Sequence, residues 1–269
     1  MITHYAFREN DLILKDSSGR PFGAQIWLVR NYVCNQGEDT EILLLLSGCY
    51  DHQFTCDDGT CISLQARCDK KQDCMDLSDE KECQIVAFDK DRYLKDDTPP
   101  PLTQGKRLEE TLNMDVKNIL NIKEVKNILS LKFKLEETWK DSRLSYYNLK
   151  EDQELNSLIY FERQQIWVPT ILFSNTREDF TSENDEQAFA KVIRSKKGSR
   201  LSLDTNEDIL EYKGSENEIQ IKRIYETDFL CDYDMRFYPF DIQVCTVDLV
   251  IDGNTDKFID LLPGKLTYS

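Results

Sequence analysis

The most informative segment for the fold reads Cys231-Asp-Tyr-Asp-Met-Arg-Phe-Tyr-Pro239-Phe-Asp-Ile-Gln-Val-Cys245, with 13 residues between its two cysteines. A disulfide that closes a loop of this length stabilises a folded chain by about 3 kcal/mol in the loop-entropy model. Pro239 favours an extended or turned dipeptide, and aromatic residues stand on both sides of it. An aromatic tip on a stiffened loop is suited to docking on another surface. A hairpin stapled for stability alone is the alternative that the loop by itself leaves open.

The chain around this loop, residues 106–269, has the pattern of short β-strands. From Leu129 to Leu135 every second residue is apolar, and polar turns separate the further candidates. Helix signals are few, with one near Asp152–Glu162. The pattern predicts an all-β fold, an antiparallel β-sandwich. The strand candidates are Val116–Leu120, Ile128–Thr138, Ile166–Phe173, Ala190–Arg194, Arg200–Leu203, Ile209–Tyr212, Glu218–Tyr225 and Ile242–Ile251.

Residues 49–83 contain six of the nine cysteines and too little apolar content to fold without cross-links. Acidic residues crowd its second half. Carboxylates held close by disulfides repel one another unless a cation neutralises them, and oxygen ligands without imidazole favour calcium over zinc. A solvated acidic loop is the alternative. The acidic residues are Asp69, Asp73, Asp76, Asp79 and Glu80.

The overall composition excludes several classes of function. The chain has 50 Asp+Glu against 34 Lys+Arg, a formal net charge of -16. This acidity argues against a nucleic-acid partner, because phosphate binding depends on lysine and arginine. With only 2 histidines and no phosphate-binding, nucleophile-elbow or zinc-protease motif, the sequence offers no set of catalytic groups. We therefore expect a protein that is not an enzyme.

The cysteine density indicates an oxidising compartment, yet residues 1–20 contain no signal peptide. The apolar run Ile42–Leu46 is too short to span a membrane. We expect an extracellular piece of a longer protein. Residues 1–48 are interpreted as the remnant of an upstream β-rich module, with a lectin-like module as one option, and residues 84–105 as a charged, proline-rich linker. For Cys34, an upstream partner and a buried free thiol both stay open.

The segment 231–245 resembles the signature loop of the Cys-loop, or pentameric ligand-gated, ion channels. The spacing of its cysteines and its aromatic-Pro-x-Asp core match, whereas Tyr233 stands where that family prefers an aliphatic residue. The resemblance covers about residues 90–269. Other motifs that carry it are Trp139-x-Asp141-x-Arg143-Leu144, Ile166-Trp167-x-Pro169 with Thr170 in place of the usual Asp, and Gly253-x-x-x-Lys257-Phe-Ile-Asp-Leu-Leu-Pro-Gly.

This resemblance implies a twisted sandwich on the extracellular side of the plasma membrane. Five such subunits would surround an axis and bind a small-molecule agonist at their interfaces. The disulfide loop would face the membrane and pass the binding movement to a pore formed by segments missing from this chain. The gating positions would be Tyr238, Pro239, Phe240 and Asp241, and a structural corner would consist of Trp139, Asp141 and Arg143.

The family's ligand loops map onto Lys134 and Glu136, onto the neighbourhood of Phe173, and onto Asp252. Cationic amines are held over aromatic faces. Neither Lys134 nor Glu136 is aromatic, and Phe173 lies one residue from the matching positions. We therefore expect no binding of acetylcholine-like or GABA-like agonists through the subunit's own face.

Residues 49–83 resemble an LDL-receptor class A module through Phe-x-Cys, Gly-x-Cys-Ile, Arg-Cys-Asp, Asp-Cys and Ser-Asp-Glu at the family spacing. The resemblance implies the pairs Cys49–Cys61, Cys56–Cys74 and Cys68–Cys83. Many such modules have a tryptophan where this chain has Ala66, so a calcium-stabilised spacer is favoured over a clamp for a partner's lysine. The implied calcium ligands are the side chains of Asp69, Asp73, Asp79 and Glu80 and the backbone carbonyls of Ala66 and Lys71.

The sequence thus predicts the extracellular ligand-binding portion of a Cys-loop channel-like subunit, preceded by a class A module. The alternative is a secreted or cell-surface adhesion protein that uses the same two modules without a pore.

Overall fold

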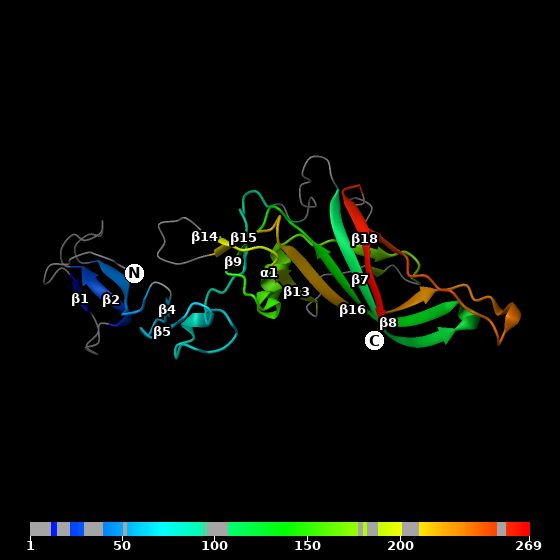
Figure 1. Cartoon of the computed structure of the whole chain (residues 1–269), viewed down its shortest axis with the longest axis horizontal. Coiled ribbons are helices and arrows are strands. Elements are labelled where there is room, and N and C mark those ends of the chain that lie inside the picture. The colour runs from blue at the N-terminus through cyan, green and yellow to red at the C-terminus, as the bar shows by residue number, and fades with distance from the viewer. Residues whose placement is uncertain are drawn as a thin grey trace. The chain divides into compact units, whose positions relative to one another are not determined.

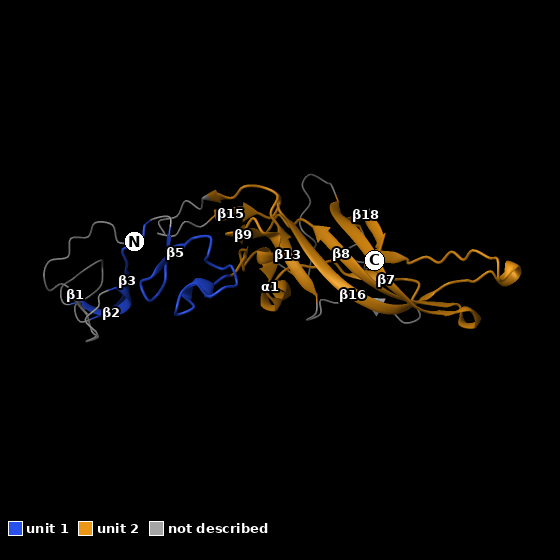
Figure 2. Ribbon diagram, turned by 60° about the horizontal axis from the view of Figure 1, so that its bottom comes forward, with its two compact units in different colours: residues 1–83, 202–208 blue, residues 84–201, 209–269 orange. Residues whose placement is uncertain are grey.

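The computed structural model describes residues 12–14, 22–29, 40–50, 53–93, 95, 107–176, 180–181, 188–200, 210–251 and 257–269. Cys34 and Asp252 lie outside these ranges. The chain forms two compact units, coloured blue and orange in Figure 2. They consist of residues 1–83 with 202–208, and of residues 84–201 with 209–269.

The N-terminal unit contains two small antiparallel sheets and the cysteine-rich segment. The backbone of β2 (Gly23–Val29) contacts the cysteine-rich segment at two glycines, Gly23 and Gly59. Their φ angles are +88° and +87°, and residues with a side chain rarely adopt such positive values. A Cβ on Gly23 would lie 2.7 Å from the carbonyl oxygen of Asp57, which also accepts the N–H of Ala24 at 2.6 Å. The elements are β1 (Leu12–Leu14), β2 (Gly23–Val29), β3 (Glu41–Leu46), β4 (Gln53–Thr55), β5 (Cys61–Ser63) and the 3₁₀ turn η1 (Ser78–Glu80).

The largest sheet of the C-terminal unit has six strands, with β8 and β16 in its interior (Figure 1). β7 and β8 form a long hairpin whose turn, η2 (Glu124–Lys126), ends at Asn127 in the left-handed region. All pairs are antiparallel except β18 with β7, which run parallel. Across the sheet the order is β10 (Ser157–Leu158), β13 (Phe189–Ile193), β16 (Glu218–Leu230), β8 (Ile128–Trp139), β7 (Leu108–Lys123) and β18 (Ile259–Tyr268).

Two smaller sheets complete this unit, in the orders β12-β11-β17 and β14-β15-β9-β6. β6 lies inside the segment 84–105 that the sequence suggested as a linker. Val86 of β6 pairs with Tyr146 of β9, and Ile85, Val86 and Phe88 pack against the core, so apolar contacts draw the start of this segment into the C-terminal unit. The strands are β6 (Val86–Ala87), β9 (Ser145–Tyr147), β11 (Ile171–Phe173), β12 (Phe180–Thr181), β14 (Ser199–Arg200), β15 (Leu210–Lys213) and β17 (Leu249–Ile251).

The core of the C-terminal unit lies on one face of the six-stranded sheet. Burial alternates along β8 from Leu131 to Trp139, as a strand with one covered face requires. One hydrophobic cluster centres on Trp139 and Trp167, whose rings meet edge to face at 6.2 Å. The other contains Phe133 and Phe173, with ring centroids 5.7 Å apart. The all-β sandwich predicted from the sequence is confirmed.

Element boundaries differ from the sequence prediction in several places. Of the expected strand Ile166–Phe173 only Ile171–Phe173 is a strand, and the strand that begins at Glu218 continues past Tyr225 to Leu230. Residues 201–203 of the expected strand Arg200–Leu203 lie outside the described ranges. β7 begins at Leu108, well before the expected Val116, and only the end of Ile242–Ile251 is a strand. The expected helix near Asp152–Glu162 is split into η3 (Gln153–Asn156) and α1 (Tyr160–Gln165), because Ile159 between them has an extended backbone. In the described part of the chain, no helix combines the length and apolarity that crossing a membrane requires.

Candidate functional site

The disulfide loop connects β16 to β17. Cys231 and Cys245 are bonded with their Cα atoms 5.2 Å apart, within the usual range for a disulfide. Between them lie the 3₁₀ turn η4 (Met235–Phe237) and a cis peptide bond before Pro239. Tyr233, the departure from the family pattern, donates its hydroxyl hydrogen to the carbonyl oxygen of Ile128 at 3.0 Å. The hydroxyl therefore ties the loop to the start of β8.

The tip of this loop exposes apolar side chains. Phe240 is 91% exposed, Ile242 90% and Phe237 71%. A group of exposed apolar side chains at one loop tip marks a candidate contact site. The side chain of Asp241 accepts a hydrogen bond from Gln243 within the same loop. Within the described ranges, Asp241 forms no ion pair with a basic side chain.

The corner after β8 is a buried polar site. Asp141 has no exposed surface and accepts three hydrogen bonds from Arg143: from the backbone N–H at 3.0 Å, from Nε at 2.9 Å and from Nη2 at 2.8 Å. The hydroxyl of Tyr93 donates at 3.0 Å to Asp141 Oδ2, the oxygen that also accepts from Arg143 Nη2, and it accepts the backbone N–H of Trp167 at 2.7 Å. Asp141 thus joins the turn after β8 to the Trp-x-Pro segment.

Tyr93 is a member of this corner that the sequence reasoning missed. Its ring lies under the guanidinium of Arg143, 4.4 Å from the ring centroid, and packs against Phe88 at 4.7 Å. Burial, with the negative charge of Asp141 beside it, raises the pKa of Tyr93. The available signal was a pair of aromatic residues, Phe88 and Tyr93, separated only by the charged residues Asp-Lys-Asp-Arg.

Of the four positions assigned to ligand loops, three are described. Glu136, on the solvent face of β8, is held by its neighbours on both sides: Asn113 Nδ2 at 3.1 Å, Gln220 Nε2 at 3.1 Å and Lys222 Nζ at 3.4 Å. Lys134 is half-buried on the same face. Phe173 is buried in the core, so its ring is not presented at the surface.

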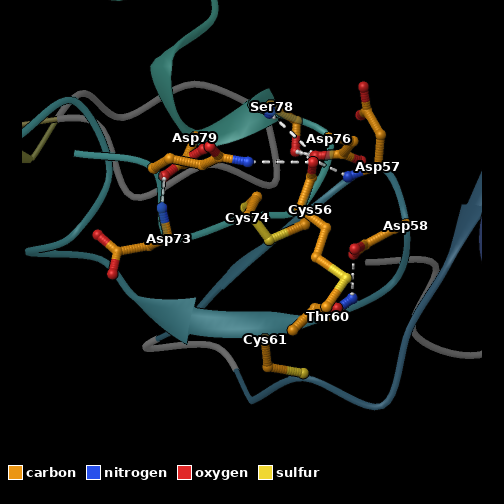
Figure 3. The surroundings of a disulfide bond; sticks show 12 residues. Cys56, Asp57, Asp58, Thr60, Cys61, Asp73, Cys74, Asp76, Ser78 and Asp79 are labelled. Atoms are coloured by element: carbon orange, nitrogen blue, oxygen red, sulfur yellow. Dashed lines mark hydrogen bonds between the residues drawn. A yellow bond between two sulfur atoms is a disulfide. The ribbon is translucent and has the colours of Figure 1, made fainter. Parts of the chain in front are cut away.

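The class A segment contains the three disulfides that the resemblance implied: Cys49–Cys61, Cys56–Cys74 and Cys68–Cys83. Its acidic side chains organise the loop that precedes η1. Asp79 Oδ2 accepts the N–H of Asp73 at 2.7 Å (Figure 3), and Glu80 Oε1 accepts the N–H groups of Asp69 and Lys70 at 2.8 and 2.9 Å. Asp69 Oδ1 accepts the N–H of Lys71 at 2.9 Å.

The oxygen donors of this loop are suited to calcium. Asp79 is fully buried, and its Oδ1 has no hydrogen-bond partner among the described residues. A buried carboxylate oxygen without a donor is costly unless a cation or proton compensates it. Within the described ranges, no three His, Cys, Asp or Glu side chains already surround a common metal position. The carboxylates of Asp69, Asp73, Asp79 and Glu80 therefore stay predicted ligands, as do the carbonyls of Ala66 and Lys71.

Comparisons with curated proteins give invertebrate receptors. The acetylcholine receptor subunit alpha-type des-2 of Caenorhabditis elegans is 27% identical over 164 residues, which cover 61% of this chain and 27% of the relative. A gamma-aminobutyric acid receptor subunit beta-like protein of Drosophila melanogaster is 22% identical over 160 residues, covering 56% and 28%. The vitellogenin receptor of Solenopsis invicta is 42% identical over 61 residues, covering 22% and 3%. The chain thus spans about a quarter of the length of the two channel relatives.

Two family models match the chain in sequence order. The model of the low-density lipoprotein receptor domain class A matches residues 47–83, and that of the neurotransmitter-gated ion-channel ligand binding domain matches residues 88–265. Neither is a family of enzymes. The second match covers most of the sandwich, including the corner and the disulfide loop. The chain therefore belongs to the neurotransmitter-gated ion-channel ligand-binding domain family, with a class A module ahead of that domain.

Proposed function

We propose that this chain is the extracellular ligand-binding part of a pentameric channel subunit and that it couples ligand binding to the gating of a pore. The pore would be formed by membrane segments outside this chain. Its partners are other channel subunits and a small-molecule agonist. The observation that carries the coupling role is the disulfide loop, whose tip exposes Phe237, Phe240 and Ile242.

The physical argument rests on the cost of that exposure. Burying a large apolar side chain contributes about 1.5–3 kcal/mol. The disulfide and the Tyr233–Ile128 hydrogen bond fix the base of the loop, so little further ordering is needed when the tip docks. A movement of β8 or β16 would reach the docked surface through these two connections.

The face that carries Lys134 and Glu136 sets the expected ligand chemistry. Glu136 is occupied by three partners on neighbouring strands, and Phe173 is in the core. Glu136 is not aromatic and is already bonded, and the ring of Phe173 is buried, so neither residue presents an aromatic face to a cationic amine. We infer that the subunit does not bind acetylcholine-like or GABA-like agonists through its own face, and that it answers to another ligand or acts beside other subunits.

We also infer that the class A module binds calcium through Asp69, Asp73, Asp79 and Glu80, with the carbonyls of Ala66 and Lys71. A bound calcium ion would neutralise carboxylates that otherwise repel one another. The chain's own contribution is already visible, because Asp79 and Glu80 hold the backbone of residues 69–73 from the opposite side of the loop. Ala66 offers no aromatic surface for a partner's lysine, so the module serves as a structural spacer.

Two experiments test the channel assignment against the adhesion alternative. The first is to sequence the transcript beyond Ser269: four apolar runs of roughly 20 residues support a channel, whereas a stop codon without them supports a soluble binder. The second compares Phe240→Ala with Met75→Ala in the full-length subunit, expressed in oocytes with its co-expressed subunits. Met75 is 89% exposed and lies in the class A module, so it is the matched control.

The electrophysiological result separates coupling from folding. We expect Phe240→Ala to reduce agonist-evoked current while surface expression stays at the wild-type level, and Met75→Ala to change neither. Wild-type currents from Phe240→Ala would overturn the coupling role of the loop.

A further inference from the structure

Three ionisable side chains lie inside the sandwich, on the covered face of the six-stranded sheet. Glu110 of β7 and Glu137 of β8 have no exposed surface, and Arg223 of β16 is 2% exposed. Neighbouring positions on these strands carry members of the two hydrophobic clusters. Two acids and one base in an apolar interior leave one negative charge without a counter-charge if all three are ionised.

The hydrogen bonds show which acid has the counter-charge. Arg223 Nη1 donates to Glu137 Oε1 at 2.5 Å, so Arg223 compensates Glu137. Both carboxyl oxygens of Glu110, and Oε2 of Glu137, have no hydrogen-bond partner among the described residues. An ionised, unpaired carboxylate in this position would cost far more than a neutral carboxylic acid.

Among the described residues, the strands that contribute to the two hydrophobic clusters beside Glu110 present apolar side chains. β18 places Leu261 beside Glu110, β11 contributes Ile171–Phe173, and β17 contributes Leu249–Ile251, all of them apolar. The charged groups that act on Glu110 are Glu137 and Arg223, and Arg223 also interacts with Tyr225 of its own strand. In this arrangement no donor among the described residues reaches Glu110, so taking up a proton or reaching water would compensate its carboxyl group.

We propose that Glu110, Glu137 and Arg223 form a buried proton-binding site and that release of its proton loosens β18 from the edge of the sheet. Glu137 stays ionised beside Arg223, and Glu110 carries the proton, which it takes from solvent on closing and returns to solvent on opening. No other reactant is involved.

The electrostatics place this exchange near neutral pH. Burial, reinforced by the charge of Glu137 and opposed by Arg223, raises the pKa of Glu110 from 4.5 to about 8. When Glu110 reaches water its pKa returns toward the ordinary value, so the open form has released a proton that the closed form keeps. The closed form therefore loses stability as pH rises from about 4.5 to about 8 and is constant above that.

β18 is the element that yields because it is an edge strand, whereas β7 and β8 are paired on both sides. Its pairing with β7 is irregular between Pro263 and Leu266. At Gly264 the backbone passes close to β7, and a Cβ there would lie 2.6 Å from the carbonyl oxygen of Leu112. Separating β18 exposes Glu110 to water without breaking the central β7, β8 and β16 ladder.

Hydrogen exchange in the full 269-residue chain, with millimolar calcium present, tests the proposal. The opening constant of β18 is obtained from the Leu261 and Leu262 amides after division by the intrinsic exchange rate. For a pKa that moves between about 8 and about 4.5, it should rise about 50-fold from pH 6 to pH 8. Glu110→Gln, which keeps the shape of the neutral acid, should abolish the rise. Glu109→Gln, at the exposed neighbouring position, should retain it.

A second measurement covers the case in which Glu110→Gln does not fold. Infrared spectra of the wild-type chain should show the C=O band of a protonated carboxylic acid at pH 6 that disappears above pH 9. A flat opening constant in the wild type, an equal rise in Glu110→Gln, or the absence of this band would each overturn the proposal.

Discussion

Replacing Asp141 with asparagine should destabilise the sandwich strongly, because this single carboxylate accepts four hydrogen bonds in a site without exposed surface. Removing the charge leaves the guanidinium of Arg143 without its counter-ion, and the amide NH₂ then faces a donor. Breaking a buried ion pair by removing one partner costs about 3–5 kcal/mol. The Arg143 side chain keeps 14% of its surface exposed, so we expect about 3 kcal/mol. For a unit of this size that lowers Tm by about 6–12 °C.

The matched control for D141N is D89N. Asp89 also pairs with an arginine, Arg92, at 3.4 Å, but the two side chains are 56% and 86% exposed. Exposed pairs of this kind contribute about 0–1 kcal/mol. Thermal unfolding followed by far-ultraviolet circular dichroism should therefore separate the two variants clearly. Equal Tm shifts for D141N and D89N would refute the reasoning that burial gives the corner its strength.

Two further outcomes are expected. Asp79→Ala should remove most of the calcium dependence of disulfide-coupled refolding of the chain. Asp58→Ala should not, because Asp58 is an exposed side chain whose carboxylate accepts the N–H of Thr60. Chromatography of the refolded disulfide isomers with and without chelator measures both variants, and a single isomer in excess chelator would count against calcium binding. Titration calorimetry of the completed homopentamer should detect no binding of acetylcholine or GABA at millimolar or lower concentration. If such binding occurred and mutation of Phe173 abolished it, the prediction that this subunit has no aromatic cage would be wrong.

Local sequence patterns were enough to predict the features of the sandwich that a single strand determines, namely where the strand lies in the sequence and which of its faces is buried. The alternation from Leu129 to Leu135 places β8 because a strand with one buried face must repeat every two residues. The loop spacing suggested the pair Cys231–Cys245, whereas the other three pairings came from the resemblance to the class A family, and all four are present.

Contacts between distant segments were not predictable in this way. Tyr93 joins the corner by hydrogen bonds to Asp141 and Trp167, which are far along the chain. Glu110 looks like one more surface acid in the run Leu108 to Leu112, and only the pairing of β7 with β8 and β18 shows that it points into the core. Charge in a sequence normally indicates exposure, and the exceptions depend on neighbours that a single strand does not reveal.

Asp141 and Glu110 show how the number of nearby donors separates a structural carboxylate from a responsive one. Both are fully buried, and both belong to the same sandwich. Asp141 has four donors aimed at it, so the charged form is supported from every side and the corner is fixed. Glu110 has none among the described residues and shares its only cation with Glu137, so the form that fits the closed sheet is the neutral one. A group whose closed and open states prefer different protonation links conformation to pH, and the absence of donors around Glu110 among the described residues is what gives it that property.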